Sequence, residues 1–160
     1  ITMGQLDLAD QQLQAALQAD PRDYRALNAM GIVLDMKGLH GEAQARYRKG
    51  LEIAPEFQAL RNNLGLSLAI TGQAQEAVGQ LAPLASGSAA DGRVRQNLAL
   101  AYAIAGDMTN ALQTSRRDLP EAAAQRQLSY FMELKSLPVE DRSAAIRRNP
   151  AFFPQGSRDS

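Results

Sequence analysis

The stretch that decides the fold, Tyr24 to Phe57, reads YRALNAMGIVLDMKGLHGEAQARYRKGLEIAPEF. Its pattern returns along the chain at a step of 34 residues. The recurring columns hold small residues, large apolar residues and prolines: Gly4, Gly38, Gly72 and Gly106; Ala9, Ala43, Ala77 and Ala111; Gly31, Gly65 and Ala99; Leu13, Tyr47, Leu81 and Ser115; Pro21 and Pro55. Because composition alone would not align so many columns, the sequence contains an internal structural repeat.

Each column has a role in a helix–turn–helix unit. Gly38 falls where a first helix should end, because glycine takes a left-handed C-cap without steric cost. Gly31 and Ala43 are small where two helix backbones would cross, and Pro55 would end the second helix. A 34-residue unit of this kind resembles the tetratricopeptide repeat (TPR). We therefore predict an all-α chain that folds as a TPR superhelical solenoid.

The repeats also predict how the chain is organised. The expected parts, in order, are a half repeat (1–23), repeats at 24–57, 58–91 and 92–120, a capping helix (121–137) and a largely flexible C-terminal extension (138–160). The half repeat supplies only a second helix, which suggests that further sequence lies upstream. The capping helix would cover the apolar face of the last repeat, as a repeat array requires. Within the extension, a short helix from Val139 to Arg148 is possible.

Charge and composition exclude several classes of protein. Seventeen Lys and Arg residues balance 17 Asp and Glu residues, so the formal net charge is zero. This argues against a binder of duplex nucleic acid, which needs a basic face, and against strong adhesion to an anionic membrane. The chain contains no cysteine, which excludes disulfides and thiolate metal sites. Its apolar stretches are too short to span a bilayer.

The sequence offers no constellation of catalytic or metal-binding residues. The single histidine, His40, lies in the turn of the first full repeat, where we expect it to pack or to face solvent. No His, Asp and Glu cluster has metal-ligand spacing, and no glycine-rich phosphate loop is present. Ser86 lacks a neighbouring base that could activate it. We therefore predict no enzymatic activity, no catalytic residue, no metal site and no cofactor.

Beyond the general TPR pattern, three motifs are similar to one particular family. They are RQNLALAYAIAGD at Arg95–Asp107, RRDL at Arg116–Leu119, and RNNLGLS at Arg61–Ser67. With these motifs the chain resembles, over roughly residues 4–137, the TadD family of TPR lipoproteins from bacterial tight-adherence (Flp) pilus systems.

This resemblance implies a place and a role. It implies a protein held at the periplasmic face of the bacterial outer membrane by a lipidated N-terminal cysteine, which this chain, beginning at Ile1, does not contain. It further implies help in pilus assembly, as a pilotin for the secretin, with the secretin or other pilus-assembly components as partners. The alternatives are a cytosolic TPR adaptor or co-chaperone that binds a peptide or helix, and a regulatory subunit of an enzyme. A signal peptide and lipobox cysteine upstream would favour the first reading.

The first helix of each TPR lines the concave face of the solenoid, so this face is the predicted partner-binding groove. Its expected residues are Arg25, Asn28, Ile32, Met36, Asn62, Asn63, Leu66, Ile70, Gln96, Asn97, Leu100 and Ile104. Two aliphatic rows, Ile32, Leu66, Leu100 and Met36, Ile70, Ile104, suit the apolar face of an amphipathic helix. The amides of Asn28, Asn62, Asn63, Gln96 and Asn97 can both donate to and accept from a peptide backbone. Alternatively, these residues only pack between neighbouring helices. Phe152 and Phe153 could cover the last helix, fold back into this groove or dock on a partner.

Overall fold

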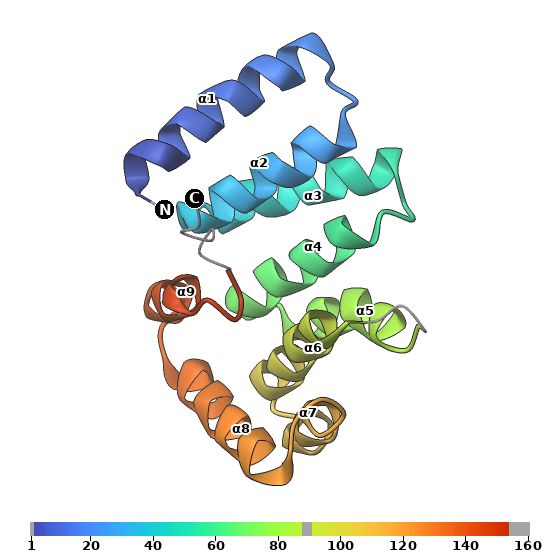
Figure 1. Cartoon of the computed structure of the whole chain (residues 1–160), viewed down its shortest axis with the longest axis vertical. Coiled ribbons are helices and arrows are strands. Elements are labelled where there is room, and N and C mark those ends of the chain that lie inside the picture. Colours follow the sequence, from blue (N-terminus) through green and yellow to red (C-terminus); the bar gives the residue numbers. More distant parts are fainter. Residues whose placement is uncertain (1, 88–90, 154–160) are drawn as a thin grey trace, which may run out of the picture.

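The computed structural model describes residues 2–87 and 91–153, and within these residues every regular element is a helix. The helices are α1 (Met3–Ala19), α2 (Tyr24–Met36), α3 (His40–Ile53), α4 (Gln58–Ile70), α5 (Ala74–Ala85), α6 (Gly92–Ala105), α7 (Met108–Ser115), α8 (Glu121–Ser136) and α9 (Val139–Arg148) (Figure 1). None of the helices in the described residues is both long enough and apolar enough to cross a membrane.

The helices pack in consecutive pairs. Helix α2 packs on α3, α4 on α5, and α6 on α7, and each pair falls within one 34-residue period. The first helices also contact one another, α2 with α4 and α4 with α6, so the pairs stack into a curved row (Figure 1). The prediction of an all-α, TPR-like helical solenoid is therefore confirmed.

Local sequence sets where the first helices begin and end. The carboxylates of Asp23 and Asp91 accept backbone N–H hydrogen bonds at the starts of α2 and α6, as N-cap residues do. Gly38, Gly72 and Gly106 follow the ends of α2, α4 and α6 with φ of 81°, 85° and 89°, a left-handed conformation that favours glycine. These glycines let the chain turn at once, so that the second helix packs back on the first.

Where the two helices of each pair cross, the sizes of the facing side chains are complementary. Gly31 lies against the ring of Tyr47, and Gly65 lies against Leu81, so closely that a Cβ atom on either glycine would overlap its neighbour. At the equivalent positions of the third pair the glycine is replaced by Ala99 and the large partner by Ser115. A small residue on the first helix is thus paired with a large one on the second, and where the first is larger, as at Ala99, the second is smaller, as at Ser115.

The C-terminal segment returns over the repeats. Helix α8 packs on α6 and α7, and α9 packs on α4, so both run back along the side where α4 and α6 end (Figure 1). Ile146 and Phe152 are buried in the main hydrophobic cluster, and the Phe152 ring lies 6.2 Å from that of Phe131 in α8. The expected flexible extension is thus wrong for residues 139–153, because their apolar side chains bury against the solenoid. Residues 154–160 of that extension lie outside the described residues.

Candidate binding surface

The predicted groove is accessible at one end and covered at the other. On α2, Arg25 is exposed, and Asn28, Ile32 and Met36 are partly exposed. On α4 and α6 the aliphatic rows are core residues: Leu66, Ile70, Leu100 and Ile104 are all buried, with at most 9% of their surface exposed. The prediction of a continuous aliphatic groove is therefore wrong along these two helices.

The cover comes from the protein itself. Ile146, Phe152 and Phe153 belong to the same hydrophobic cluster as Ile70 and Ile104. Sequence periodicity could show that α4 and α6 carry an apolar stripe, but not that a segment far along the chain packs on it. The open question about Phe152 and Phe153 is thereby answered, because both side chains are buried in the fold.

The amides predicted to hold a peptide backbone hold neighbouring helices together instead. Asn63 Nδ2 donates to Asn28 Oδ1 at 2.9 Å, and Asn97 Nδ2 donates to Asn62 Oδ1 at 3.0 Å. Asn97 is buried, and its Oδ1 has no hydrogen-bond partner within the described residues. Gln96, the remaining predicted amide, lines a cavity of about 230 Å³ bordered by α6, α7 and α8. The two amide–amide hydrogen bonds therefore link α2 to α4 and α4 to α6.

An open groove lies between α1 and α2. Its volume is about 450 Å³, and its lining residues are Gln5, Leu6, Ala9, Leu13, Ala29, Ile32, Val33 and Met36. Gln5 is the one polar residue in this lining. Ile32 and Met36 were predicted from the sequence, whereas the α1 side was missed. The signal for it was present, because Leu6, Ala9 and Leu13 stand 34 residues before His40, Ala43 and Tyr47.

An ion-pair cluster joins the two walls of this groove. Lys37, which follows α2, contacts Asp7 at 3.0 Å and Asp10 at 2.8 Å, and both aspartates lie on α1. The hydrogen bond from Lys37 holds the pKa of Asp10 below its usual value. The cluster ties α1 to the end of α2, so the two walls keep a defined separation.

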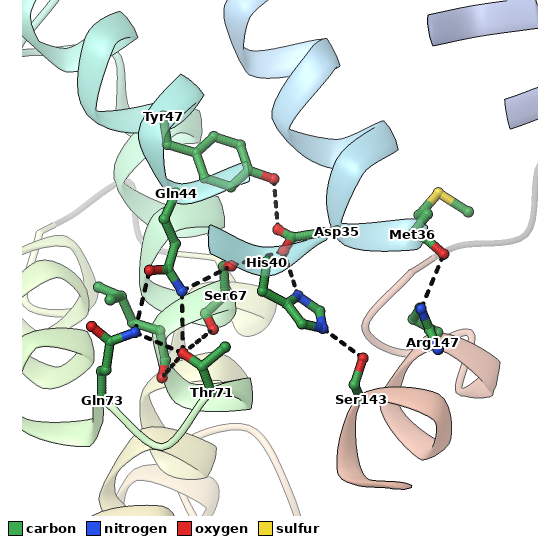
Figure 2. Close-up of polar contacts among 11 residues, drawn as sticks. Asp35, Met36, His40, Gln44, Tyr47, Ser67, Thr71, Gln73, Ser143 and Arg147 are labelled. Atoms are coloured by element: carbon green, nitrogen blue, oxygen red, sulfur yellow. Dashed lines mark hydrogen bonds and ion pairs between the residues drawn. The ribbon is translucent and has the colours of Figure 1, made fainter. Parts of the chain in front are cut away.

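A buried polar cluster, called here the polar junction, joins α2, α3 and α4. Asp35 on α2 accepts hydrogen bonds from Tyr47 Oη at 2.9 Å, from Ser67 Oγ at 2.7 Å and from His40 Nδ1 at 2.7 Å (Figure 2). All four side chains are buried. Burial, reinforced by the Asp35 carboxylate, raises the pKa of Tyr47 far above its usual value, so the phenol remains a hydrogen-bond donor.

The polar junction also reaches α9. His40 Nε2 lies 2.6 Å from Ser143 Oγ, so Asp35, His40 and Ser143 form a chain of hydrogen bonds (Figure 2). The same order of groups occurs in Ser–His–Asp catalytic triads. Here Ser143 is only 3% exposed, and it lines neither the α1/α2 groove nor the smaller cavity. In this geometry the chain of hydrogen bonds positions α9 on the repeats.

Cations from the C-terminal segment approach the ends of the first helices. Arg142 donates to the carbonyl oxygen of Ile70, the last residue of α4, at 3.1 Å, and to three carbonyls around the end of α8. Arg147 donates to the carbonyl of Met36, the last residue of α2, at 3.4 Å (Figure 2). Lys135 Nζ lies beside Gly106, just past α6. A cation stabilises the C-terminal end of a helix, where the carbonyl groups carry partial negative charge. These contacts therefore help to hold the C-terminal segment against the ends of α2, α4 and α6.

The described residues contain no group of three or more His, Asp or Glu side chains placed to hold a metal ion. Of the predicted binding surface, the part that stays open is the α1/α2 groove.

Comparison with known proteins points to repeats of the TPR kind. No protein-family model matches the chain. A stretch of 66 residues is 46% identical to the uncharacterized protein y4yS of Sinorhizobium fredii, covering 41% of this chain and 36% of that protein. A stretch of 93 residues is 31% identical to the TPR repeat-containing thioredoxin TTL4 of Arabidopsis thaliana, covering 58% of this chain and 14% of that protein. The chain thus matches well under half of the length of either relative.

Proposed function

We propose that the chain is a protein-interaction scaffold whose open binding site is the α1/α2 groove. The observation that carries the proposal is an apolar groove of about 450 Å³ left open on a solenoid that covers its other apolar rows. A concave site lined by apolar side chains is typical of a surface that binds another molecule. We further propose that the chain has no catalytic activity of its own.

The fold and one relative support this proposal. Stacked helix pairs present extended surfaces for binding, which suits a scaffold. The similarity to a plant protein named for its TPR repeats agrees with that reading. The thioredoxin part of that name is not carried over to this chain.

A finer proposal follows from the resemblance of the motifs at Arg61–Ser67 and Arg95–Asp107 to the TadD family. On this proposal the chain acts at the periplasmic face of the bacterial outer membrane, where it assists the secretin or another component of tight-adherence pilus assembly. A cytosolic adaptor that binds a helical segment is the second candidate, because the α1/α2 groove would serve equally there.

Photo-cross-linking in cells tests both levels of this proposal. The photoreactive residue p-benzoylphenylalanine replaces Ile32 inside the groove or, as a matched control, the exposed Ala15 of α1. We expect protein adducts from position 32 and not from position 15. Adducts with a secretin or another envelope component support the pilus role, and purely cytosolic adducts contradict it. Absence of any adduct from position 32 would contradict the scaffold itself.

A further inference from the structure

We infer that residues 139–153, called here the strap, are autoinhibitory and close a second binding surface, on α4 and α6. The strap opens as one unit about the linker between α8 and α9, while α1–α8 stay folded. The surface beneath it accepts a partner helix of the strap's own kind, in which an arginine precedes an aliphatic residue by four positions. This surface is separate from the α1/α2 groove, so the inference does not depend on that groove.

Helix α9 is attached to the fold mainly by polar side chains. Three of its ten residues are buried, namely Arg142, Ser143 and Ile146, and of these only Ile146 is apolar. By contrast, α4 buries eight of its 13 residues, seven of them without a polar side chain. Beyond α9, Phe152 and Phe153 complete the buried apolar side chains of the strap. Segments that bury few apolar groups are the ones that open locally while the rest of a protein stays folded.

The hydrogen bonds of the strap can be replaced by bonds to water when it opens. Arg142 donates to the carbonyl of Ile70 and to three carbonyls around the end of α8, and Ser143 bonds His40. Opening exposes both members of each pair on the strap side of α4, so neither remains buried without a partner. The net cost of exchanging such bonds for bonds to water is small. The bonds therefore position the strap precisely and still allow it to leave.

The remaining helices have packing partners that do not involve the strap. Helix α2 packs on α1, α3 and α4, and α6 packs on α4, α5, α7 and α8. Repeats of this kind are stabilised by their neighbours, so the array keeps its fold when the strap is open. The linker between α8 and α9 is Leu137 and Pro138, whose ψ angles of 148° and 156° are extended. A short non-helical linker of this kind can act as a hinge.

The strap lies on the face where the sequence places a partner. Ile70 and Ile104 belong to one aliphatic row of the predicted concave groove, and they stand 34 residues apart on α4 and α6. In the closed structure they are 0% and 9% exposed and belong to one hydrophobic cluster with Ile146, Phe152 and Phe153. The strap is therefore a segment of the chain that occupies its own predicted binding surface.

The strap also shows which chemistry this surface accepts. The carbonyl groups at the end of α4 carry partial negative charge, and Arg142 donates to the carbonyl of Ile70 there at 3.1 Å. Four residues later, Ile146 is fully buried in the hydrophobic cluster. Positions i and i+4 lie on the same face of a helix. A partner helix with arginine and an aliphatic residue at this spacing would make both contacts once the strap has left.

A peptide with the strap's own sequence tests the inference on the full chain. The probe is a fluorescein-labelled peptide of residues 137–153, and its matched control carries Arg142→Met. The probe competes with the attached strap, so its apparent affinity is lowered in proportion to the small fraction of chains that are open. We expect weak, saturable binding of the probe in fluorescence anisotropy, and binding of the control weaker by about tenfold.

Variants of the chain separate the strap from the surface beneath it. Arg142→Met in the chain weakens the attached strap and leaves α4 and α6 unaltered, so the probe should bind about tenfold or more tightly. Arg148→Met, at an exposed position of α9, should leave the affinity unchanged. Circular dichroism confirms that both variants fold. Equal probe affinities for the two variants, equal binding of the two peptides, or no binding to the Arg142→Met chain overturns the inference.

Native-state hydrogen exchange tests whether the strap opens as a unit. We expect the protected amides of residues 139–153 to share one level of protection, at least about tenfold below that of α4 and α6. Arg142→Met should lower protection of the strap further and leave that of α2 and α6 unchanged. A single level of protection across the strap, α4 and α6 would mean that the strap leaves only when the whole protein unfolds, and it would overturn the inference.

Discussion

Where α2 meets α3 and α4, the buried positions hold Asp35, His40 and Ser67; one repeat later, where α4 meets α5 and α6, the same positions hold Ala69, Ala74 and Ala101. The second set, together with Leu81, forms an apolar junction that is stabilised by packing alone. The polar junction adds directional hydrogen bonds, and one of them reaches Ser143 in α9.

The difference shows how one repeat can form a specific contact with α9 while the next contributes only to the stability of the fold. An apolar junction accepts any neighbour of the right shape, whereas a buried polar group is satisfied only by a partner in the right place. We therefore expect the polar junction, and not the apolar one, to select where α9 lies. Four tests, beginning with the largest expected effect and ending with the smallest, examine this contrast.

Removing the acceptor of the polar junction should have the largest effect. Asp35→Ala leaves His40, Tyr47 and Ser67 without the carboxylate that accepts from all three. We expect the free energy of unfolding, measured in urea, to fall by about 3 kcal/mol or more. Introducing the apolar set instead, with Tyr47→Leu and with alanine at the other three positions, should recover much of that loss. A fall well below about 1 kcal/mol for Asp35→Ala would contradict the contrast.

Arg142 attaches α9 to the end of α4, the first helix of the apolar junction. Arg142→Met removes hydrogen bonds to four backbone carbonyls while it retains an apolar side chain of similar length. We expect a loss of about 2 kcal/mol and faster hydrogen exchange in α9. The control is Arg148→Met, because Arg148 is exposed on the same helix. Unchanged exchange in α9 would show that its other contacts, which include the bond from Ser143 to the polar junction, hold it without Arg142.

The crossing glycines compare the two repeats directly. Gly31→Ala meets the rigid ring of Tyr47, whereas Gly65→Ala meets the flexible side chain of Leu81. Overpacking costs about 1–3 kcal/mol, and we place Gly31→Ala toward the upper end of that range and Gly65→Ala toward the lower end. Thermal unfolding of both variants measures the difference. The reverse order would mean that the Leu81 side of the crossing is the more rigid.

Ser143→Ala should have the smallest effect, and the most local one. It removes only the last hydrogen bond of the chain that starts at Asp35 and passes through His40. We expect a loss of about 1 kcal/mol, with faster exchange confined to α9. If Ser143→Ala leaves α9 unchanged when measured beside Arg142→Met, the polar junction does not select the position of that helix.

Much of this fold could be predicted because local sequence sets it. The 34-residue columns predicted the helix pairs and the glycines that end the first helices, and local sequence allowed a helix at Val139–Arg148, since each depends on neighbours within a few turns. The covered groove could not be predicted in the same way. His40 and Ser143 are 103 residues apart, and no periodic pattern connects them. Likewise, the columns show that Asn28 is equivalent to Asn62 and Asn63 to Asn97, but not that Asn63 bonds Asn28 or that Asn97 bonds Asn62.

The site was predicted in part for the same reason. Ile32 and Met36 follow from the expected concave face of the first repeat, and both line the open groove. Leu66 and Leu100 follow from the identical argument, and both are core. Periodicity identifies an apolar stripe, whereas the rest of the chain decides whether anything covers it.

Because α9 packs back on the early repeats, the protein cannot complete its fold while it is being synthesised from the N-terminus. An array in which each unit contacts only its neighbours can complete every unit as it emerges, from the N-terminus onward. Here the apolar residues of α4 and α6 are covered only by residues 139–153, which are synthesised after the repeats. At the usual speed of translation, the roughly 30 residues that follow the repeats take about 2–7 seconds to appear. For that interval the nascent chain displays an apolar surface that residues 139–153 later cover, and a premature stop before residue 139 would make the display permanent.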